Sequence, residues 1–148
     1  MCGHGTIGTI TAAIESGLLC AKTPGKLTID VPAGQINIDY QQAGQKVDWV
    51  KIYNVPSYLA HQDVILDIPG LGPLKIDVSY GGNYYAIVDP QQNFPGLRHW
   101  SAGDILHWSP IVRQIAHEQL VSVHPNDPTV NGVSHVLWTG DTISEGSN

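Results

Sequence analysis

Residues 1–8 read MCGHGTIG and lead directly into TITAAIESGLL at residues 9–19. Ile7, Ile10 and Ile14 recur at spacings of three and four, the pattern of one buried face of a helix. Unpaired N–H groups and a partial positive charge at a helix N-terminus favour a bound carboxylate and a neighbouring thiolate. The stretch therefore predicts a helix whose first turn carries a thiol and can bind an anion. The alternative is that the Gly-rich turn is only a tight connection before the helix.

Alternating apolar and polar residues follow this helix. Residues 26–31 and 35–40 alternate on either side of Pro32-Ala33-Gly34, which predicts a hairpin, and residues 47–53 predict a third strand. Asn54-Val55-Pro56 is a natural boundary because proline lacks the N–H that a sheet requires.

The rest of the chain predicts a second sheet and one helix. Ser101 is a suitable N-cap for a helix with apolar residues at helical spacing, which Pro110 kinks or divides into two segments. The other expected elements are a hairpin over residues 64–78, a strand at 84–88, a loop at 124–132 and a last strand at 134–138.

Composition narrows the classes of partner. The chain has 148 residues, 42% of them apolar and 14% charged, and a formal net charge of −6 with no basic block. This charge argues against nucleic acid and against an anionic membrane surface. No apolar run has the ~20 residues of a membrane span, and residue 1 is followed by a polar motif instead of a leader. The expected partner is a small molecule, and the expected location is the cytoplasm.

Cysteine and histidine usage gives two further expectations. Two cysteines make no disulfide framework, which favours a reducing compartment. Seven histidines are present, but none is arranged as HExxH or with paired CxxC and HxxxH ligands, so no metal site is expected from the spacing.

Five segments together resemble the proline racemase family, and the likeness is greatest to its bacterial 4-hydroxyproline 2-epimerases. They are MCGHGTIG (residues 1–8), TPGKLTIDVPAG (23–34), NVP (54–56), DVSYGGNYYAIV (77–88) and SHVLWTG (134–140). The resemblance implies an α/β (α+β) fold of the diaminopimelate-epimerase type, built from two similar units that each wrap a sheet around a central helix. Residues 1–52 would be part of the first unit and residues 53–148 most of the second.

The resemblance also implies an activity and its residues. The reaction is inversion at the α-carbon of 4-hydroxyproline without metal or other cofactor, with one acid–base cysteine on each face of that carbon. Cys2 matches the first cysteine, the amides of Gly3 and His4 would hold the substrate carboxylate, and the His4 side chain would line the pocket. His135 matches a histidine that contacts the substrate from the second unit.

Other conspicuous residues are expected to be structural. Cys20 follows two leucines and lies more than ~20 Å along the predicted helix from Cys2, so it is expected to be buried packing. Asn83 is expected to form a turn. The four tryptophans, Trp49, Trp100, Trp108 and Trp138, are expected to be packing residues.

The second signature of the family, Asp-Arg-Ser-Pro-Cys-Gly-Thr-Gly, does not occur in these 148 residues. The chain is therefore expected to be an internal piece of a longer enzyme. Two other activities of the family, trans-3-hydroxyproline dehydratase and proline racemase, stay open, because the deciding position lies outside the sequence. A folded fragment without activity is the alternative from another class, and a homodimer is also left open.

Overall fold

The computed structural model describes residues 2–142 and 144. The chain folds as two compact units, Met1–Pro56 and Ser57–Asn148. The last strand of the first unit continues to Tyr53, and the units divide after Pro56.

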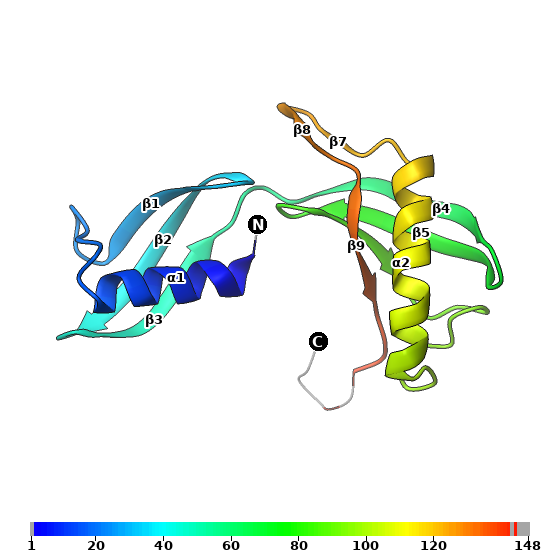
Figure 1. Ribbon diagram of the computed structural model, residues 1–148, viewed down its shortest axis with the longest axis horizontal. Helices are drawn as coiled ribbons and strands as arrows, with labels where there is room; N and C mark the ends of the chain where they lie inside the picture. The colour runs from blue at the N-terminus through cyan, green and yellow to red at the C-terminus, as the bar shows by residue number, and fades with distance from the viewer. Residues whose placement is uncertain (1, 143, 145–148) are drawn as a thin grey trace. The chain divides into compact units, whose positions relative to one another are not determined.

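The first unit is one helix on a three-stranded antiparallel sheet (Figure 1). Helix α1 spans Gly3–Glu15, and the sheet has the order β1 (Lys26–Val31), β2 (Gly34–Ala43) and β3 (Lys46–Tyr53). Ile29 pairs with Ile36 in the β1–β2 hairpin. The predicted helix, hairpin and third strand are therefore all present.

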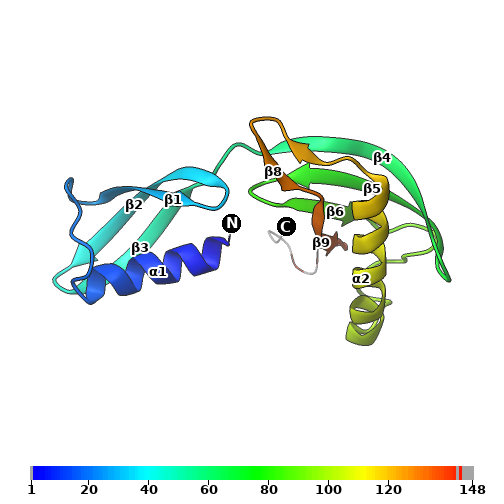
Figure 2. The same ribbon diagram turned by 45° about the horizontal axis from the view of Figure 1, so that its top comes forward.

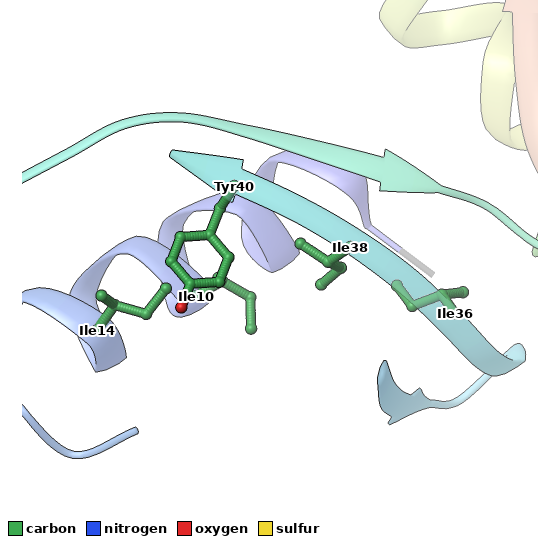
Figure 3. Packing of buried hydrophobic residues seen from close by; sticks show 5 residues of the cluster. All are labelled: Ile10, Ile14, Ile36, Ile38 and Tyr40. Atoms are coloured by element: carbon green, nitrogen blue, oxygen red, sulfur yellow. The ribbon is translucent and has the colours of Figure 1, made fainter. Parts of the chain in front are cut away.

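The core of this unit lies between α1 and β2. Ile10 and Ile14 of the helix pack with Ile36, Ile38 and Tyr40 of β2 (Figure 3), and all five are at least nine-tenths buried. Burial of such aliphatic side chains stabilises a fold by about 1.5–3 kcal/mol each. The sheet thus holds α1 through the second half of the helix.

The expectation that Ile7 is buried with this face is wrong, because its side chain is 40% exposed. Ile7 lies two turns before Ile14 on the same side of the helix, so the spacing itself is helical. The difference arises because the described residues of this unit do not fully cover the first turns of α1. The N-terminal end of the helix is therefore left accessible.

The expectation that Cys20 is buried is also wrong. Helix α1 ends at Glu15, and Gly17 adopts a left-handed φ of 71° just after the Ser16 cap, as a helix-terminating glycine does. Cys20 consequently lies in the connection to β1, and its side chain is exposed. The neighbouring Leu18 is 85% exposed.

The second unit is a four-stranded sheet with helix α2 on one face (Figures 1 and 2). Its strands lie in the order β4 (Tyr58–Ile68), β5 (Gly72–Tyr80), β6 (Tyr84–Val88) and β9 (Val133–Trp138). The β4–β5 hairpin and both later strands confirm the prediction. Strand β9 runs parallel to β6, and α2 (Ala102–Gln119) lies between them in the sequence, so the three elements form a β–α–β crossover.

Helix α2 begins at a capping box. The Ser101 hydroxyl accepts the Asp104 amide N–H, and the Asp104 carboxylate accepts the Ser101 N–H at 2.7 Å. The Ser101 hydroxyl also donates to the Asp104 carboxylate at 2.7 Å, and this bond, followed by the one from the Ser101 N–H, lowers the pKa of Asp104. The helix continues through Pro110 to Gln119, so the alternative of two segments is wrong. Val112 and Ala116 face the core and are fully buried.

Two further expectations need correction, one in each unit. The segment predicted as a loop, residues 124–132, contains most of a small hairpin formed by β7 (Val123–His124) and β8 (Asp127–Asn131). Its proline and asparagines hide the strand pattern. In the first unit Trp49 is 47% exposed, and its indole N–H donates to Gln41, whereas Trp138 is buried against Phe94 and Trp100.

No helix of the described residues is both long and apolar enough to cross a membrane.

Candidate active site

Cys2 is the N-cap of helix α1. Its backbone is extended, with φ −123° and ψ 109°, and its sulfur accepts the N–H of Gly5 at 3.4 Å. Its carbonyl accepts the Thr6 N–H and the Thr6 hydroxyl, both at 3.0 Å. A capping side chain three residues before the amide that it accepts is the usual N-cap geometry, here with sulfur in place of oxygen. The thiol is exposed.

Two amides stand beside this thiol. Gly3 and His4 occupy the first turn of α1, and their N–H groups donate to no other described residue. The first N–H groups of any helix lack partners within the helix, and with the helix dipole they favour an anion. The His4 side chain is exposed and makes no hydrogen bond within residues 2–142 and 144. Cys2, Gly3 and His4 thus form one accessible turn that can receive a carboxylate next to a thiol.

The glycine at position 5 keeps this turn open. A Cβ atom added to Gly5 would contact the Cys2 sulfur at 3.5 Å, whereas one added to Gly8 would meet nothing within 4 Å. A side chain at Gly5 would therefore cover part of the sulfur. The spacing from Cys2 to Gly5 is visible in the sequence, but only the N-cap geometry shows that a side chain at position 5 would lie against the Cys2 sulfur.

His135 belongs to the second unit, on strand β9. Strands β6 and β9 pair Tyr84 with Val133 and then Tyr85 with His135, so β9 has one extra residue, Ser134, at this point. Such a bulge bends the strand and redirects a side chain. The rings of Tyr85 and His135 stack with centroids 4.8 Å apart and planes 17° apart.

Ser134 bonds both to this histidine and to the neighbouring strand. Its Oγ lies 3.0 Å from the carbonyl oxygen of Tyr84 and 2.8 Å from Nδ1 of His135. Tyr85 also lines a pocket of the second unit, together with Ile87 and Leu137 from the same face of the sheet. Sequence reasoning missed Ser134 and Tyr85 as partners of His135, because no sequence pattern within β6 or β9 indicates that these two strands pair.

On the opposite face of the sheet, three tyrosines lie side by side across β4, β5 and β6. Tyr58 pairs with Tyr80, Tyr80 pairs with Tyr84, and the hydroxyls of Tyr58 and Tyr84 are 2.6 Å apart. Burial, and then the hydrogen bond with the Tyr58 hydroxyl, raise the pKa of Tyr84 well above its ordinary value. The phenol of Tyr84 is therefore neutral, and the strand that supports the bulge at Ser134 carries no charge there.

Metal binding has no support in the described part of the chain. Within residues 2–142 and 144 there is no group of three or more His, Cys, Asp or Glu side chains arranged to hold a metal ion.

Comparison with known proteins places these features in context. The model of the family described as proline racemase matches residues 1–148. A 4-hydroxyproline 2-epimerase of Shewanella loihica is 84% identical over 148 residues, which are all of this chain and 44% of that protein. The chain thus spans less than half of the length of this curated relative.

Two solved structures are similar in fold. A probable proline racemase from Agrobacterium radiobacter K84 with bound carbonate aligns with a TM-score of 0.78 and 28% identity, covering 90% of this chain and 40% of that one. A hydroxyproline epimerase from Agrobacterium vitis with bound trans-4-hydroxy-L-proline aligns with a TM-score of 0.74 and 24% identity, covering 88% of this chain and 38% of that one. The expected α+β fold of the diaminopimelate-epimerase type is thereby confirmed.

Proposed function

The chain belongs to the proline racemase family, and we propose that the protein to which it belongs inverts the α-carbon of 4-hydroxyproline with Cys2 as one of two acid–base groups. The observation that carries the proposal is the first turn of α1, which presents the Cys2 sulfur beside the amides of Gly3 and His4. The Shewanella loihica relative supports the choice of 4-hydroxyproline over the other substrates of the family.

The chemistry requires three things at one carbon. A base must remove the α-proton from one face, an acid must deliver a proton to the opposite face, and the carboxylate must be stabilised as charge grows on it in the carbanionic transition state. Cys2, as thiolate, would take the proton, so that the C–H bond breaks and an S–H bond forms. The amides of Gly3 and His4 would hold the carboxylate and stabilise its developing charge.

The return proton would come from a second thiol. The family resemblance assigns it to the cysteine of an Asp-Arg-Ser-Pro-Cys signature, which these 148 residues do not contain. In the reverse direction the two thiols exchange roles, with Cys2 as the acid. The His4 ring, which follows Cys2 by two residues, and His135 would contact the ring nitrogen or hydroxyl of the substrate. The proposal needs neither metal nor another cofactor, and the two parts of the chain would belong to the two domains of the enzyme.

A reduced thiol is a condition of this mechanism. Cys2 is free and exposed, so an oxidising compartment would convert it to a disulfide or a higher oxidation state. A cytoplasmic location is therefore part of the proposal.

The test is turnover by the full-length protein. We expect it to convert trans-4-hydroxy-L-proline to the epimer, followed by polarimetry or chiral chromatography, and to incorporate deuterium at the α-carbon in deuterium oxide. Pyrrole-2-carboxylate, a planar mimic of the carbanion, should inhibit it and protect Cys2 from alkylation. Loss of water from trans-3-hydroxy-L-proline without epimerisation would favour a dehydratase, and exclusive turnover of proline would favour a proline racemase.

A further inference from the structure

Neighbouring residues of a strand point to opposite faces of a sheet, so Ser134 and His135 would not normally touch through their side chains. They do touch here because Ser134 is the extra residue of the bulge between β9 and β6. The bulge brings the Ser134 hydroxyl to 2.8 Å from Nδ1 of His135 while it also lies 3.0 Å from the Tyr84 carbonyl. One hydroxyl therefore links the imidazole to the backbone of the neighbouring strand.

The single proton of that hydroxyl decides the state of the imidazole. A carbonyl oxygen can only accept, so the Ser134 hydroxyl must donate its one proton to Tyr84. The Ser134 oxygen then has only lone pairs left for Nδ1, and Nδ1 must carry a proton and donate it to Ser134. In the neutral imidazole the other nitrogen, Nε2, is consequently without a proton and can accept a hydrogen bond.

The surroundings of His135 leave that acceptor available. The side chain is exposed, and Nε2 makes no hydrogen bond to any residue of 2–142 or to residue 144. The stacked ring of Tyr85 fixes the plane of the imidazole, because a ring rotated about its axis would lose the contact at 4.8 Å. Ser134 and Tyr85 thus hold the His135 ring in place, and its Nε2 atom is left accessible as an acceptor.

We infer that Ser134 is a positioning residue that holds His135 in the Nδ1-protonated tautomer, so that Nε2 accepts a hydrogen bond from an N–H or O–H donor of the substrate. The inference rests on the proposed function for the identity of that substrate, a cyclic imino acid. Such a substrate carries donors at its ring nitrogen and, in hydroxyproline, at its hydroxyl. Facing the protonated ring nitrogen, which can only donate, an imidazole protonated at Nε2 would instead present a donor to a donor, which is repulsive.

The tautomer can be read directly by nitrogen-15 NMR on the 148-residue chain labelled at histidine. At a pH where a titration in the same sample shows the ring of His135 to be neutral, we expect a pyrrole-type signal for Nδ1 and a pyridine-type signal for Nε2. Ser134→Ala should move both signals toward the opposite tautomer, and Ser134→Thr, which retains the hydroxyl, should not. A wild-type ring protonated at Nε2, or signals unchanged in Ser134→Ala, would overturn the inference.

The same variants in the full-length protein test the consequence for substrate. Ser134→Ala should lower kcat/KM about tenfold, the size of one lost hydrogen bond, mainly by raising KM, with recovery in Ser134→Thr. Unchanged kinetics in Ser134→Ala would remove the positioning role even if the tautomer is as expected. Because the NMR measurement needs no substrate, absence of epimerase activity in the wild-type protein would refute the proposed function separately and leave the tautomer result standing.

Discussion

The backbone N–H of Gly5 donates to the sulfur of Cys2 across 3.4 Å, which makes a cysteine the N-cap of helix α1. The nucleophile of a cysteine is its thiolate, and a hydrogen bond from an amide at a helix N-terminus stabilises negative charge on the sulfur that accepts it. The other cysteine, Cys20, lies in the connection after the helix and accepts no hydrogen bond from another described residue.

Cys2 should therefore react faster with iodoacetamide than Cys20. Both thiols are exposed, so the difference in rate reports the helix end and not access. A helix terminus contributes about 0.3–1 kcal/mol at an exposed site, which corresponds to a factor of about two to five. Mass spectrometry of the timed reaction, with Cys2→Ser and Cys20→Ser to assign the two rates, measures it. Equal rates, or faster labelling of Cys20, would contradict the role given to the Gly5 amide.

A methyl group at position 5 should slow that reaction while stabilising the helix. Replacing a helical glycine by alanine stabilises by about 0.5–1 kcal/mol. In Gly5→Ala the new Cβ would contact the sulfur at 3.5 Å, whereas in Gly8→Ala it would meet no atom within 4 Å. We expect both variants to be more stable to urea, but only Gly5→Ala to be alkylated more slowly at Cys2. A slower reaction in Gly8→Ala as well would show that helix stability, and not cover, controls the thiol.

Burial along α1 differs between two isoleucines of the same helical face. Ile10 is 3% exposed and Ile7 is 40% exposed. Ile10→Val should destabilise the first unit by about 0.5–1.5 kcal/mol, the usual effect of removing one buried methylene group. Ile7→Val, the matched control, should change the free energy of unfolding by less than about 0.5 kcal/mol. Urea unfolding followed by circular dichroism measures both values, and equal losses would mean that the first turn is covered after all.

These two isoleucines also mark the limit of what the sequence predicts. Helical spacing identifies the face, and the alternating strands identify the hairpin that packs on Ile10 and Ile14. The spacing does not show how far along the helix the sheet extends, so it wrongly predicts that Ile7 is buried. The burial expected for Cys20 failed for a related reason, because it depended on a helix longer than the one that ends at Glu15.

The site could be predicted only where its contacts are local. Cys2, Gly3 and His4 are consecutive, and the helix that follows them implies their arrangement. Ser134 reaches the Tyr84 carbonyl across fifty positions of the chain, through a parallel pairing that exists only after α2 has crossed the sheet. The register that places a bulge at Ser134 leaves no pattern within β9 itself, so the environment of His135 had to come from the structure.

Acid should weaken the first unit through Glu15. Its carboxylate accepts the Val47 N–H at 3.0 Å and lies 3.4 Å from the Lys46 ammonium. The hydrogen bond from the Val47 backbone, followed by Lys46, lowers the pKa of Glu15 in the folded protein. A lowered folded pKa gives stability that is present above the unfolded value of about 4.3 and is lost as the pH falls through the folded pKa.

The measurement is urea unfolding of wild type and Glu15→Gln between pH 7 and pH 3. The wild type should lose more free energy of unfolding over this range than the variant does, because the variant has no carboxylate to protonate at this position. Parallel curves for the two proteins would show that the Glu15 contact to β3 contributes nothing to the acid sensitivity.

The last prediction concerns the activity of these 148 residues alone. Inversion at the α-carbon needs a base on one face, an acid on the other and a site that excludes water. The chain supplies one cysteine that matches the family signature, and its other cysteine, Cys20, follows the far end of α1 from Cys2. Loss of one of two groups that act together commonly costs several powers of ten in rate.

We therefore expect no measurable epimerisation of trans-4-hydroxy-L-proline by the 148-residue chain, and activity in the full-length protein that disappears in Cys2→Ser. Chiral chromatography on the three proteins decides the point. Turnover by the 148-residue chain would mean that the second acid–base group lies within it, and His4→Ala and His135→Ala would then show which histidine supplies it.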